Sequence, residues 1–439
     1  MPMEDSARAA CVSRTFMRSW RHHPYLILSN ETLGLIDLIL KNHSGTGIKT
    51  LKLDVYACSD LNACYLNDWL QIAITPTIES LTLQLPSEYE HEYDFPCSLL
   101  FGVNGNLIRH LHLNYCAFRP TVGTGCLISL TKLHLDHVCI TGEELGCLLS
   151  SSLASMQLKL EYCDEIICLK IPCMLEQLSR LLTVSDCSML RMIESQAPNL
   201  MTLDFDGDNL VQLGQSLQVK NLVMDFFDAT NFLNYSVTKL PNMVPNLETL
   251  TLFSYFEMLN TPTVVAKFHH LKYLKIYMVG GDPGYDFCSL GSVLDAAPVL
   301  ETFILCVIQT DMEFDPVFWD ASNMRQTPEH KYKSLKNVMI FGFFSDKSLV
   351  ELTCHILENA TSLESIILDT VYAHGDNNSF DRCIIGPARC KCCFLLDAEI
   401  LKANKGVIAI QKYIAEKVPF DVKLDVRGPC RRQCHTSEP

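Results

Sequence analysis

A short leucine pattern that recurs along most of the chain constrains the fold more than any other feature. In residues 246–252 it puts apolar side chains at Leu247, Leu250 and Leu252, separated first by two free positions and then by one. The alternation that ends the pattern is typical of a β-strand, whereas a helix repeats its apolar residues at a spacing of about 3.6. Further copies end at Leu53, Leu83, Leu113, Leu135, Phe205, Met224, Ile276, Leu305, Ile340 and Leu368, and weaker copies end at Leu160 and Val184.

The spacing of the copies indicates the kind of repeat. From Leu53 to Leu368 thirteen copies leave twelve intervals with a mean of (368 − 53)/12, about 26 residues, which lies within the range of leucine-rich repeats. Unrelated core strands would not recur at this period with the same preceding aliphatic residue. The sequence therefore predicts an α/β leucine-rich-repeat solenoid, in which a curved parallel sheet is backed by helical or irregular return segments. Residues 61–74 and 346–360 have helical spacing, whereas the shortest intervals leave room for an extended turn or one helical turn.

Three cysteines strengthen this interpretation. Cys116, Cys163 and Cys187 each lie three residues after the last aliphatic of a copy, where leucine-rich repeats carry Asn or Cys. A small, weakly donating thiol suits a buried turn whose backbone carbonyls need a partner. We interpret these cysteines as structural.

Composition narrows the class of protein. Lys plus Arg total 35 against 50 Asp plus Glu, a net charge of −15, which disfavours binding to nucleic acid or to an anionic membrane. No apolar run reaches the length of a membrane span, and Glu4 and Asp5 interrupt any signal-peptide core. The 21 cysteines include those of the repeats and favour a reducing compartment. We expect a cytoplasmic or nuclear protein.

Residues 4–23 have the spacing of an amphipathic helix. Ala9, Val12, Phe16 and Trp20 fall on one face, and arginines occupy the others. A solvated helix that caps the repeats and a helix that binds a partner both fit this pattern. Composition alone favours neither function decisively.

The N-terminal run up to Pro24 resembles the second half of an F-box, as found in plant F-box/LRR proteins. The resemblance implies docking on a Skp-family adaptor of a cullin-RING ubiquitin ligase, with Ala9, Val12, Phe16 and Trp20 as the adaptor-binding residues. In that family a Leu-Pro-containing helix precedes the match, so we expect either a shortened product or weakened docking. The matching positions are Arg8, Ala9, Ala10, Val12, Ser13, Arg14 and Trp20.

Residues beside the inward leucines must point to the other face of the sheet. There we expect acidic side chains in the first copies and an apolar strip in later ones, which together bind a protein partner. Alternatively, the C-terminal segment folds over the apolar strip and buries it. The strip is formed by Phe253, Tyr277, Cys306 and Phe341, and the predicted partner-binding residues are Asp136, Glu161, Asp206, Phe253, Tyr277 and Phe341.

The C-terminal region should close the solenoid. Residues 398–418 have mostly helical spacing and 420–426 alternate, which predicts a capping helix and a last strand. The stretch 403–419 resembles the C-terminal FBD-like segment of the same plant family. Cysteines cluster at 390–393 and 430–434 without the paired spacing of common zinc sites, so we predict no metal there.

No catalytic motif appears, so the sequence predicts a non-catalytic binding protein without a cofactor. The histidines are scattered, with no spacing along the chain that defines a metal site or a triad. We divide the chain into a partial F-box at 1–35, the solenoid at 36–375 and a capping segment at 376–439. The expected function is substrate recognition for an SCF-type ubiquitin ligase, through a Skp-family adaptor and an unknown protein substrate. The alternative is a repeat module that binds a protein without ligase coupling.

Overall fold

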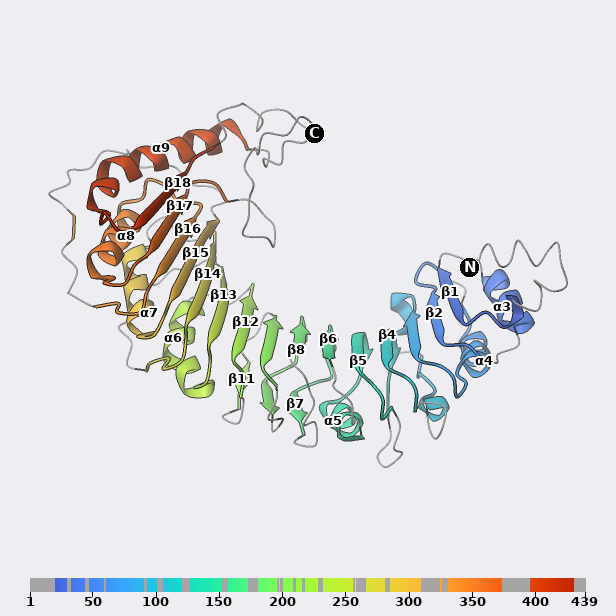
Figure 1. The fold of residues 1–439 in the computed structure, drawn as a ribbon. Coiled ribbons are helices and arrows are strands. Elements are labelled where there is room, and N and C mark those ends of the chain that lie inside the picture. Colours follow the sequence, from blue (N-terminus) through green and yellow to red (C-terminus); the bar gives the residue numbers. More distant parts are fainter. Residues whose placement is uncertain are drawn as a thin grey trace. The chain divides into compact units, whose positions relative to one another are not determined.

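A computed structural model of the chain divides it into two compact units, Met1–Val219 and Lys220–Pro439. We describe each unit by itself (Figure 1). The residues that the structure describes are 20–29, 33–43, 47–58, 61–90, 93–100, 106–120, 127–151, 157–172, 181–195, 197, 200–207, 211–214, 218–227, 232–255, 257, 266–280, 285–308, 324–325, 331–372 and 395–429.

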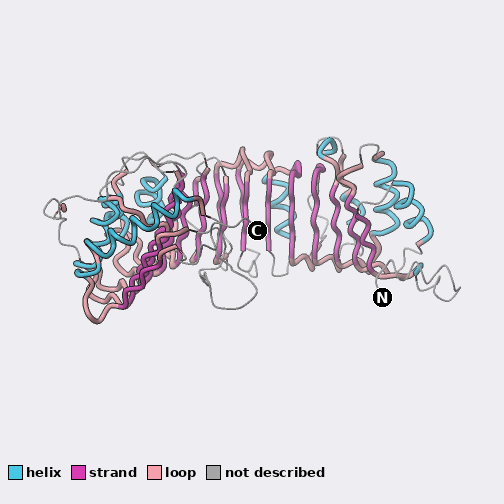
Figure 2. Tube along the Cα trace, turned by 90° about the horizontal axis from the view of Figure 1, so that it is seen from above, coloured by secondary structure: helices cyan, strands magenta, loops and turns pink. Residues whose placement is uncertain are grey.

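The first unit is built on parallel strands that follow one another in chain order. Each neighbouring pair is parallel and in register, as in Leu51↔Leu81 and Leu111↔Leu133, and Figure 2 shows the strands side by side. The strands are β1 (Tyr25–Ser29), β2 (Thr50–Asp54), β3 (Ser80–Gln84), β4 (His110–Ala117), β5 (Lys132–Cys139), β6 (Gln157–Glu161), β8 (Leu181–Ser185) and β10 (Thr202–Asp206).

Return segments of the first unit differ in form along the chain. Longer returns contain helices, and the shorter ones after β6 contain strands of a second, three-stranded sheet in the order β11-β9-β7. The sequence predicts an extended turn or one helical turn in the shortest returns, and the described short returns after β6 contain extended strands. The elements are α3 (Leu33–Asn42), α4 (Ala63–Ala73), α5 (Gly142–Ser151), the 3₁₀ turns η1 (Ser87–Tyr89) and η2 (Cys97–Leu100), and β7 (Cys168–Ile171), β9 (Met192–Ser195) and β11 (Gln212–Leu213).

The second unit repeats the same plan. Its helices α6, α7 and α8 lie on the same side of its strands (Figure 1). The strands, in order and parallel, are β12 (Asn221–Phe226), β13 (Thr249–Tyr255), β14 (Tyr273–Val279), β15 (Thr302–Ile308), β16 (Asn337–Phe341), β17 (Ser365–Asp369) and β18 (Lys423–Arg427). The helical elements are α6 (Phe232–Met243), η4 (Phe287–Leu290), α7 (Gly291–Asp295), α8 (Lys347–Asn359), α9 (Asp397–Tyr413) and η6 (Ala415–Lys417).

The leucine pattern forms the core of each unit. In β2, for example, Leu51 and Leu53 are fully buried while the residues between and beside them are half-buried. Each such leucine contributes roughly 1.5–3 kcal/mol by leaving water. Because equivalent residues pair from strand to strand, the buried side chains form continuous ladders within a unit. The predicted α/β leucine-rich-repeat fold is therefore confirmed.

The repeat cysteines occupy the buried turns that the sequence predicts. The Cys163 thiol lies 3.6 Å from the Leu135 carbonyl oxygen and 3.4 Å from that of Glu161. Its backbone N–H in turn donates to the Cys187 sulfur at 3.4 Å. Burial raises the pKa of the Cys116 thiol well above its usual range, so that thiol stays protonated and unreactive. These contacts confirm the structural interpretation.

The end of the second unit is closed by α9 and β18. Strand β18 extends the sheet by pairing with β17 in parallel, and α9 buries Ala409 and Ile410. The Glu399 carboxylate accepts a hydrogen bond from the Leu396 backbone N–H at 2.7 Å and so caps the helix. The predicted capping helix and last strand are thus present. The cysteine clusters at 390–393 and 430–434 lie outside the described residues, and the predicted domain boundaries stay a prediction.

One glycine marks a close approach of two backbones. Gly342 follows β16 with φ +71°, and a Cβ there would lie 2.1 Å from the Val307 carbonyl oxygen. Only glycine fits both the conformation and the space. In the described part of the chain, none of the helices is long and apolar enough to cross a membrane.

Candidate protein-binding surface

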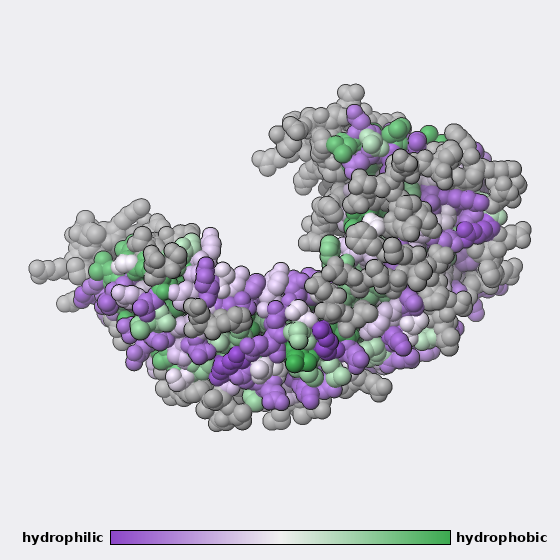
Figure 3. Space-filling view, turned by 180° about the vertical axis from the view of Figure 1, so that it is seen from behind, coloured by the Kyte–Doolittle hydropathy of each residue, from purple (hydrophilic) through white to green (hydrophobic). Residues whose placement is uncertain are grey.

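The sheet face opposite the buried ladder carries two rows of side chains in the first unit. Strand register brings these residues side by side as the alternation predicts. Hydrophilic residues are frequent on the described surface in Figure 3. We call the first the central row, Lys52, Thr82, His112, His134, Lys159, Thr183 and Asp204, and the second the acidic row, Asp54, Gln84, Asn114, Asp136, Glu161, Ser185 and Asp206.

Asp136 is held by two neighbours. The buried Asn114 side chain donates from Nδ2 to Asp136 Oδ2 at 2.7 Å, and His137 Nδ1 lies 2.7 Å from Asp136 Oδ1. Since an ionised carboxylate only accepts, His137 donates its Nδ1 proton. The carboxylate is therefore fixed in orientation and keeps lone pairs for a further partner.

Glu161 is also held from two sides. Its Oε2 lies 2.5 Å from His134 Nε2 and 2.8 Å from Lys159 Nζ. Burial by itself would raise the pKa of Glu161, but the hydrogen bonds from Lys159 and His134 outweigh it and lower the pKa. Glu161 is therefore ionised at neutral pH and is already paired with two residues of the central row.

Asp204 differs from these two carboxylates. Its burial raises the pKa of the Asp204 carboxyl. Among the described residues no ion pair to Asp204 is found. A cationic side chain from a partner would therefore find here a carboxylate without a competing cation.

His112 and His134 stack on neighbouring strands. Their ring centroids are 4.0 Å apart with an interplanar angle of 11°. Burial, followed by the nearby His134, lowers the pKa of His112 to about 4, against the opposing charges of Asp136 and Glu161. The His112 ring is therefore neutral at neutral pH. Its Nε2 atom is buried without a hydrogen-bond partner in the described structure.

A feature that the sequence analysis missed lies beside the acidic row. Tyr115, His137, Tyr162 and Asp186 all adopt the left-handed backbone conformation, with φ between 49° and 53°. Each of the four directly precedes the residue at the cysteine position of its repeat. This shared position is the one feature of the sequence from which the turn could have been predicted. This conformation costs roughly 1–2 kcal/mol for a non-glycine residue.

The same turn positions build a stack of rings. Tyr115 and His137 lie 4.4 Å apart, and His137 and Tyr162 lie 4.3 Å apart, between ring centroids. Tyr162 is 42% exposed. We call Tyr115, His137 and Tyr162 the aromatic ladder. It joins the acidic row through the His137 to Asp136 hydrogen bond and offers rigid aromatic surface next to carboxylates.

The predicted apolar strip of the second unit is only partly open. Phe253 and Tyr277 stack at 4.2 Å with an angle of 5° and are half-buried. Phe341 is 6% exposed and Cys306 is 2% exposed, in a cluster against which Tyr372 packs. Phe341 is therefore closed to a partner in the described structure, in agreement with the alternative that a later segment buries the strip, and the covering residue is Tyr372, just after β17. Phe253 and Tyr277 stay predicted contact residues.

The other predicted residues divide between described and undescribed segments. Asp206 lies at the end of the acidic row, half-buried on β10. Of the predicted adaptor-binding residues, Trp20 is half-buried at the start of the described chain. Ala9, Val12 and Phe16 lie outside the described residues, so adaptor docking stays a prediction.

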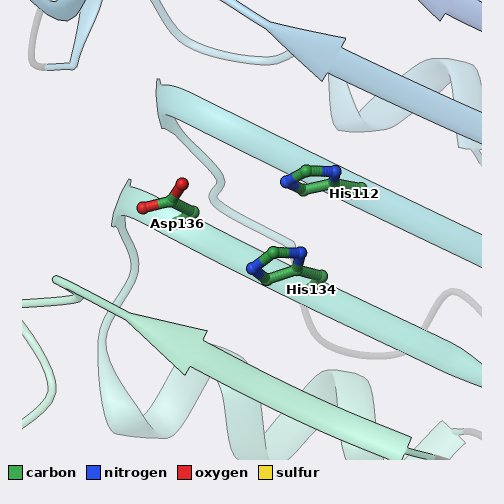
Figure 4. Close-up of side chains that lie close together, drawn as sticks. All are labelled: His112, His134 and Asp136. Carbon is green, nitrogen blue, oxygen red and sulfur yellow. The ribbon is translucent and has the colours of Figure 1, made fainter. Parts of the chain in front are cut away.

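The fold also brings together residues that the sequence analysis kept apart. Ligand atoms of His112, His134 and Asp136 lie within 4.8 Å of one another, and Figure 4 shows each ring with a nitrogen on the side where Asp136 lies. Histidines 22 positions apart meet because β4 and β5 pair in register. Spacing along the chain therefore missed this group.

Comparison with known proteins identifies the family. Residues 39–431 match the family model described as At1g61320/AtMIF1, LRR domain. The matched range excludes the N-terminal run that resembles an F-box. No curated protein matches the chain. Because the match covers most of the chain and agrees with the fold, this protein belongs to the plant At1g61320/AtMIF1-type leucine-rich-repeat family, whose domain is a protein-interaction module.

Proposed function

We propose that the first unit binds a basic segment of a partner protein on its open sheet face, as the substrate-recognition part of an SCF-type ubiquitin ligase. The observation that carries the binding proposal is the acidic row in register beside the aromatic ladder. Carboxylates attract Lys and Arg side chains, and exposed Tyr162 supplies the kind of aromatic anchor that dominates protein interfaces. The net charge of −15 favours the same class of partner.

The ion pairs already present on the face indicate which carboxylate would bind a partner's cation most strongly. Glu161 is already paired with Lys159 and His134, so a partner cation there would have to displace them. Asp204 lacks such a pair among the described residues, and its raised pKa shows the cost of its burial. We therefore place the strongest electrostatic contact at the Asp204 end of the face, with Tyr162 as the anchor. Phe253 and Tyr277 form a separate proposed contact patch on the second unit.

The ligase role rests on the resemblance of residues 1–24 to an F-box. In this proposal Ala9, Val12, Phe16 and Trp20 contact a Skp-family adaptor. The repeats hold the substrate, and ubiquitin transfer takes place on other subunits. The alternative is a repeat module that binds the same partner without ligase coupling. Of the predicted adaptor-binding residues only Trp20 is described, so the choice depends on the adaptor experiment.

The binding proposal is tested by affinity purification from plant cells with quantitative mass spectrometry. We compare the parent chain with a face variant that combines Tyr162→Ser, Asp204→Asn and Asp206→Asn. The control is Lys170→Ser, on the small sheet of the same unit, where the side chain is exposed. We expect the face variant to lose the proteins that the parent and the control both recover. Equal recovery by a folded face variant would contradict the proposal.

Ligase coupling is tested separately. A Skp-family adaptor is co-purified with the chain, with a Val12→Asp/Phe16→Asp variant, and with a chain that carries a complete first F-box helix. Retention by the chain and loss by the variant support coupling. Retention only by the extended chain supports the uncoupled repeat module.

A further inference from the structure

The group formed by His112, His134 and Asp136 has the composition of a transition-metal site. His112 and His134 are register partners on β4 and β5, and Asp136 follows His134 by two residues on the same sheet face. Their ligand atoms lie within 4.8 Å of one another (Figure 4). Two imidazoles and one carboxylate suit zinc and related ions, whereas magnesium and calcium prefer oxygen ligands alone.

His112 is in the form that a metal requires. Its Nε2 atom is buried and has no hydrogen-bond partner in the described structure. A metal ligand needs a neutral imidazole with a free lone pair. Coordination would also satisfy a polar atom that the fold otherwise leaves unpaired.

Neighbouring groups orient the other two ligands. His134 Nε2 lies 2.5 Å from Glu161 Oε2, and this contact holds the His134 ring in place. Carboxylate contacts of this kind fix and strengthen histidine ligands in metal sites. Asn114 and His137 hold the Asp136 carboxylate, one on each oxygen. Each proposed ligand is therefore supported by the protein.

We propose that His112, His134 and Asp136 bind a divalent transition-metal ion of the zinc class, with water completing the coordination. The charges of Asp136 and Glu161 exceed that of Lys159 and favour a cation at this point. In the structure the rings stack almost parallel, at 11°, so their lone pairs do not converge. Binding therefore tilts one ring out of the stack. The metal would lie on the same face that binds the protein partner.

Cobalt(II) titration of the full-length reduced protein tests this site. Cobalt bound to histidine and carboxylate shows visible absorption without the near-ultraviolet thiolate band that cysteine ligation adds, so the 21 cysteines can be distinguished. The variants are His134→Gln and Asp136→Asn. The control is His110→Gln, an exposed histidine on β4 outside the ligand group. Circular dichroism verifies that each variant is folded.

We expect both ligand variants to bind one equivalent less cobalt than the parent and to lose the absorption without thiolate character. The His110→Gln control should match the parent. Glu161→Gln should keep the stoichiometry with an affinity about 10- to 100-fold weaker. The proposal is overturned if folded Asp136→Asn binds as many equivalents as the parent, or if the control loses the same equivalent. Asp136→Asn keeps an acceptor for His137, so it serves alone if His134→Gln does not fold.

Discussion

His112 gives the protein a stability that depends on pH with a defined sign. In the folded chain its pKa lies at about 4, against 6.5 for the ordinary side chain, chiefly because burial penalises the charged ring. Between pH 6.5 and about 4, His112 is therefore protonated in the unfolded chain but stays neutral in the folded chain. The contribution of His112 is fully present above pH 6.5 and is lost as the pH falls toward 4.

The size of this effect follows from the difference in pKa. A shift of 6.5 to about 4 corresponds to about 3.4 kcal/mol at 1.36 kcal/mol per pKa step. Solvent reaches part of the half-buried ring, so we discount this to about 2 kcal/mol by pH 4.5. Asp136 and Glu161 oppose the shift, while His134 and Lys159 add to it.

Urea unfolding at a series of pH values measures the effect, with a chelator present throughout. Tryptophan fluorescence reports on the first unit when parent and variant both carry Trp319→Phe, because Trp69, which is 1% exposed, and Trp20 lie in that unit. The control is His112→Gln, which cannot titrate, so the other histidines cancel in the comparison. We expect the parent to lose about 2 kcal/mol more than the variant between pH 7 and 4.5. Parallel curves for the two proteins would refute the reasoning.

Further predictions concern the packing of each unit. Leu135→Ala leaves a cavity at a fully buried position and should lower the free energy of unfolding by about 2–5 kcal/mol. A loss below about 1 kcal/mol in urea titration would contradict the strand register that buries Leu135. Asp346 caps α8 because its Oδ1 accepts a hydrogen bond from the Leu349 N–H at 2.9 Å. Asp346→Ala should therefore lower the free energy of unfolding by about 1 kcal/mol, and Asp346→Asn should recover most of that loss in the same urea titration. Phe341→Ala should destabilise the second unit by about 3–5 kcal/mol, while the half-buried Phe253→Ala costs clearly less; equal losses in thermal unfolding would mean that Tyr372 does not cover Phe341.

Most of the fold could be predicted because the repeat is a local pattern. Alternation between Leu51 and Leu53 fixes a strand and its two faces, and the recurrence of that pattern fixes parallel pairing. The helical returns α4 and α8 also followed from spacing alone. Each of these inferences uses residues that are neighbours in the sequence.

The features that were missed depend on contacts between distant residues. Phe341 follows the outward pattern, yet it is buried by Tyr372, which lies beyond the next strand. His112 and His134 meet only through strand register, so known metal-binding spacings could not find them. Tyr115, His137 and Tyr162 adopt a backbone conformation that their residue types do not favour. There the repeat geometry overrides local preference.

The most direct test of the central claim is the recovery of partner proteins by the Tyr162→Ser/Asp204→Asn/Asp206→Asn variant, measured beside the parent and Lys170→Ser. If the open face of the first unit binds the partner, the face variant loses proteins that the control keeps. Raising the salt concentration should also reduce the recovery of those proteins by the parent, because salt screens the carboxylates. If the folded face variant recovers the parent's set of proteins in full, the partner binds elsewhere on the chain.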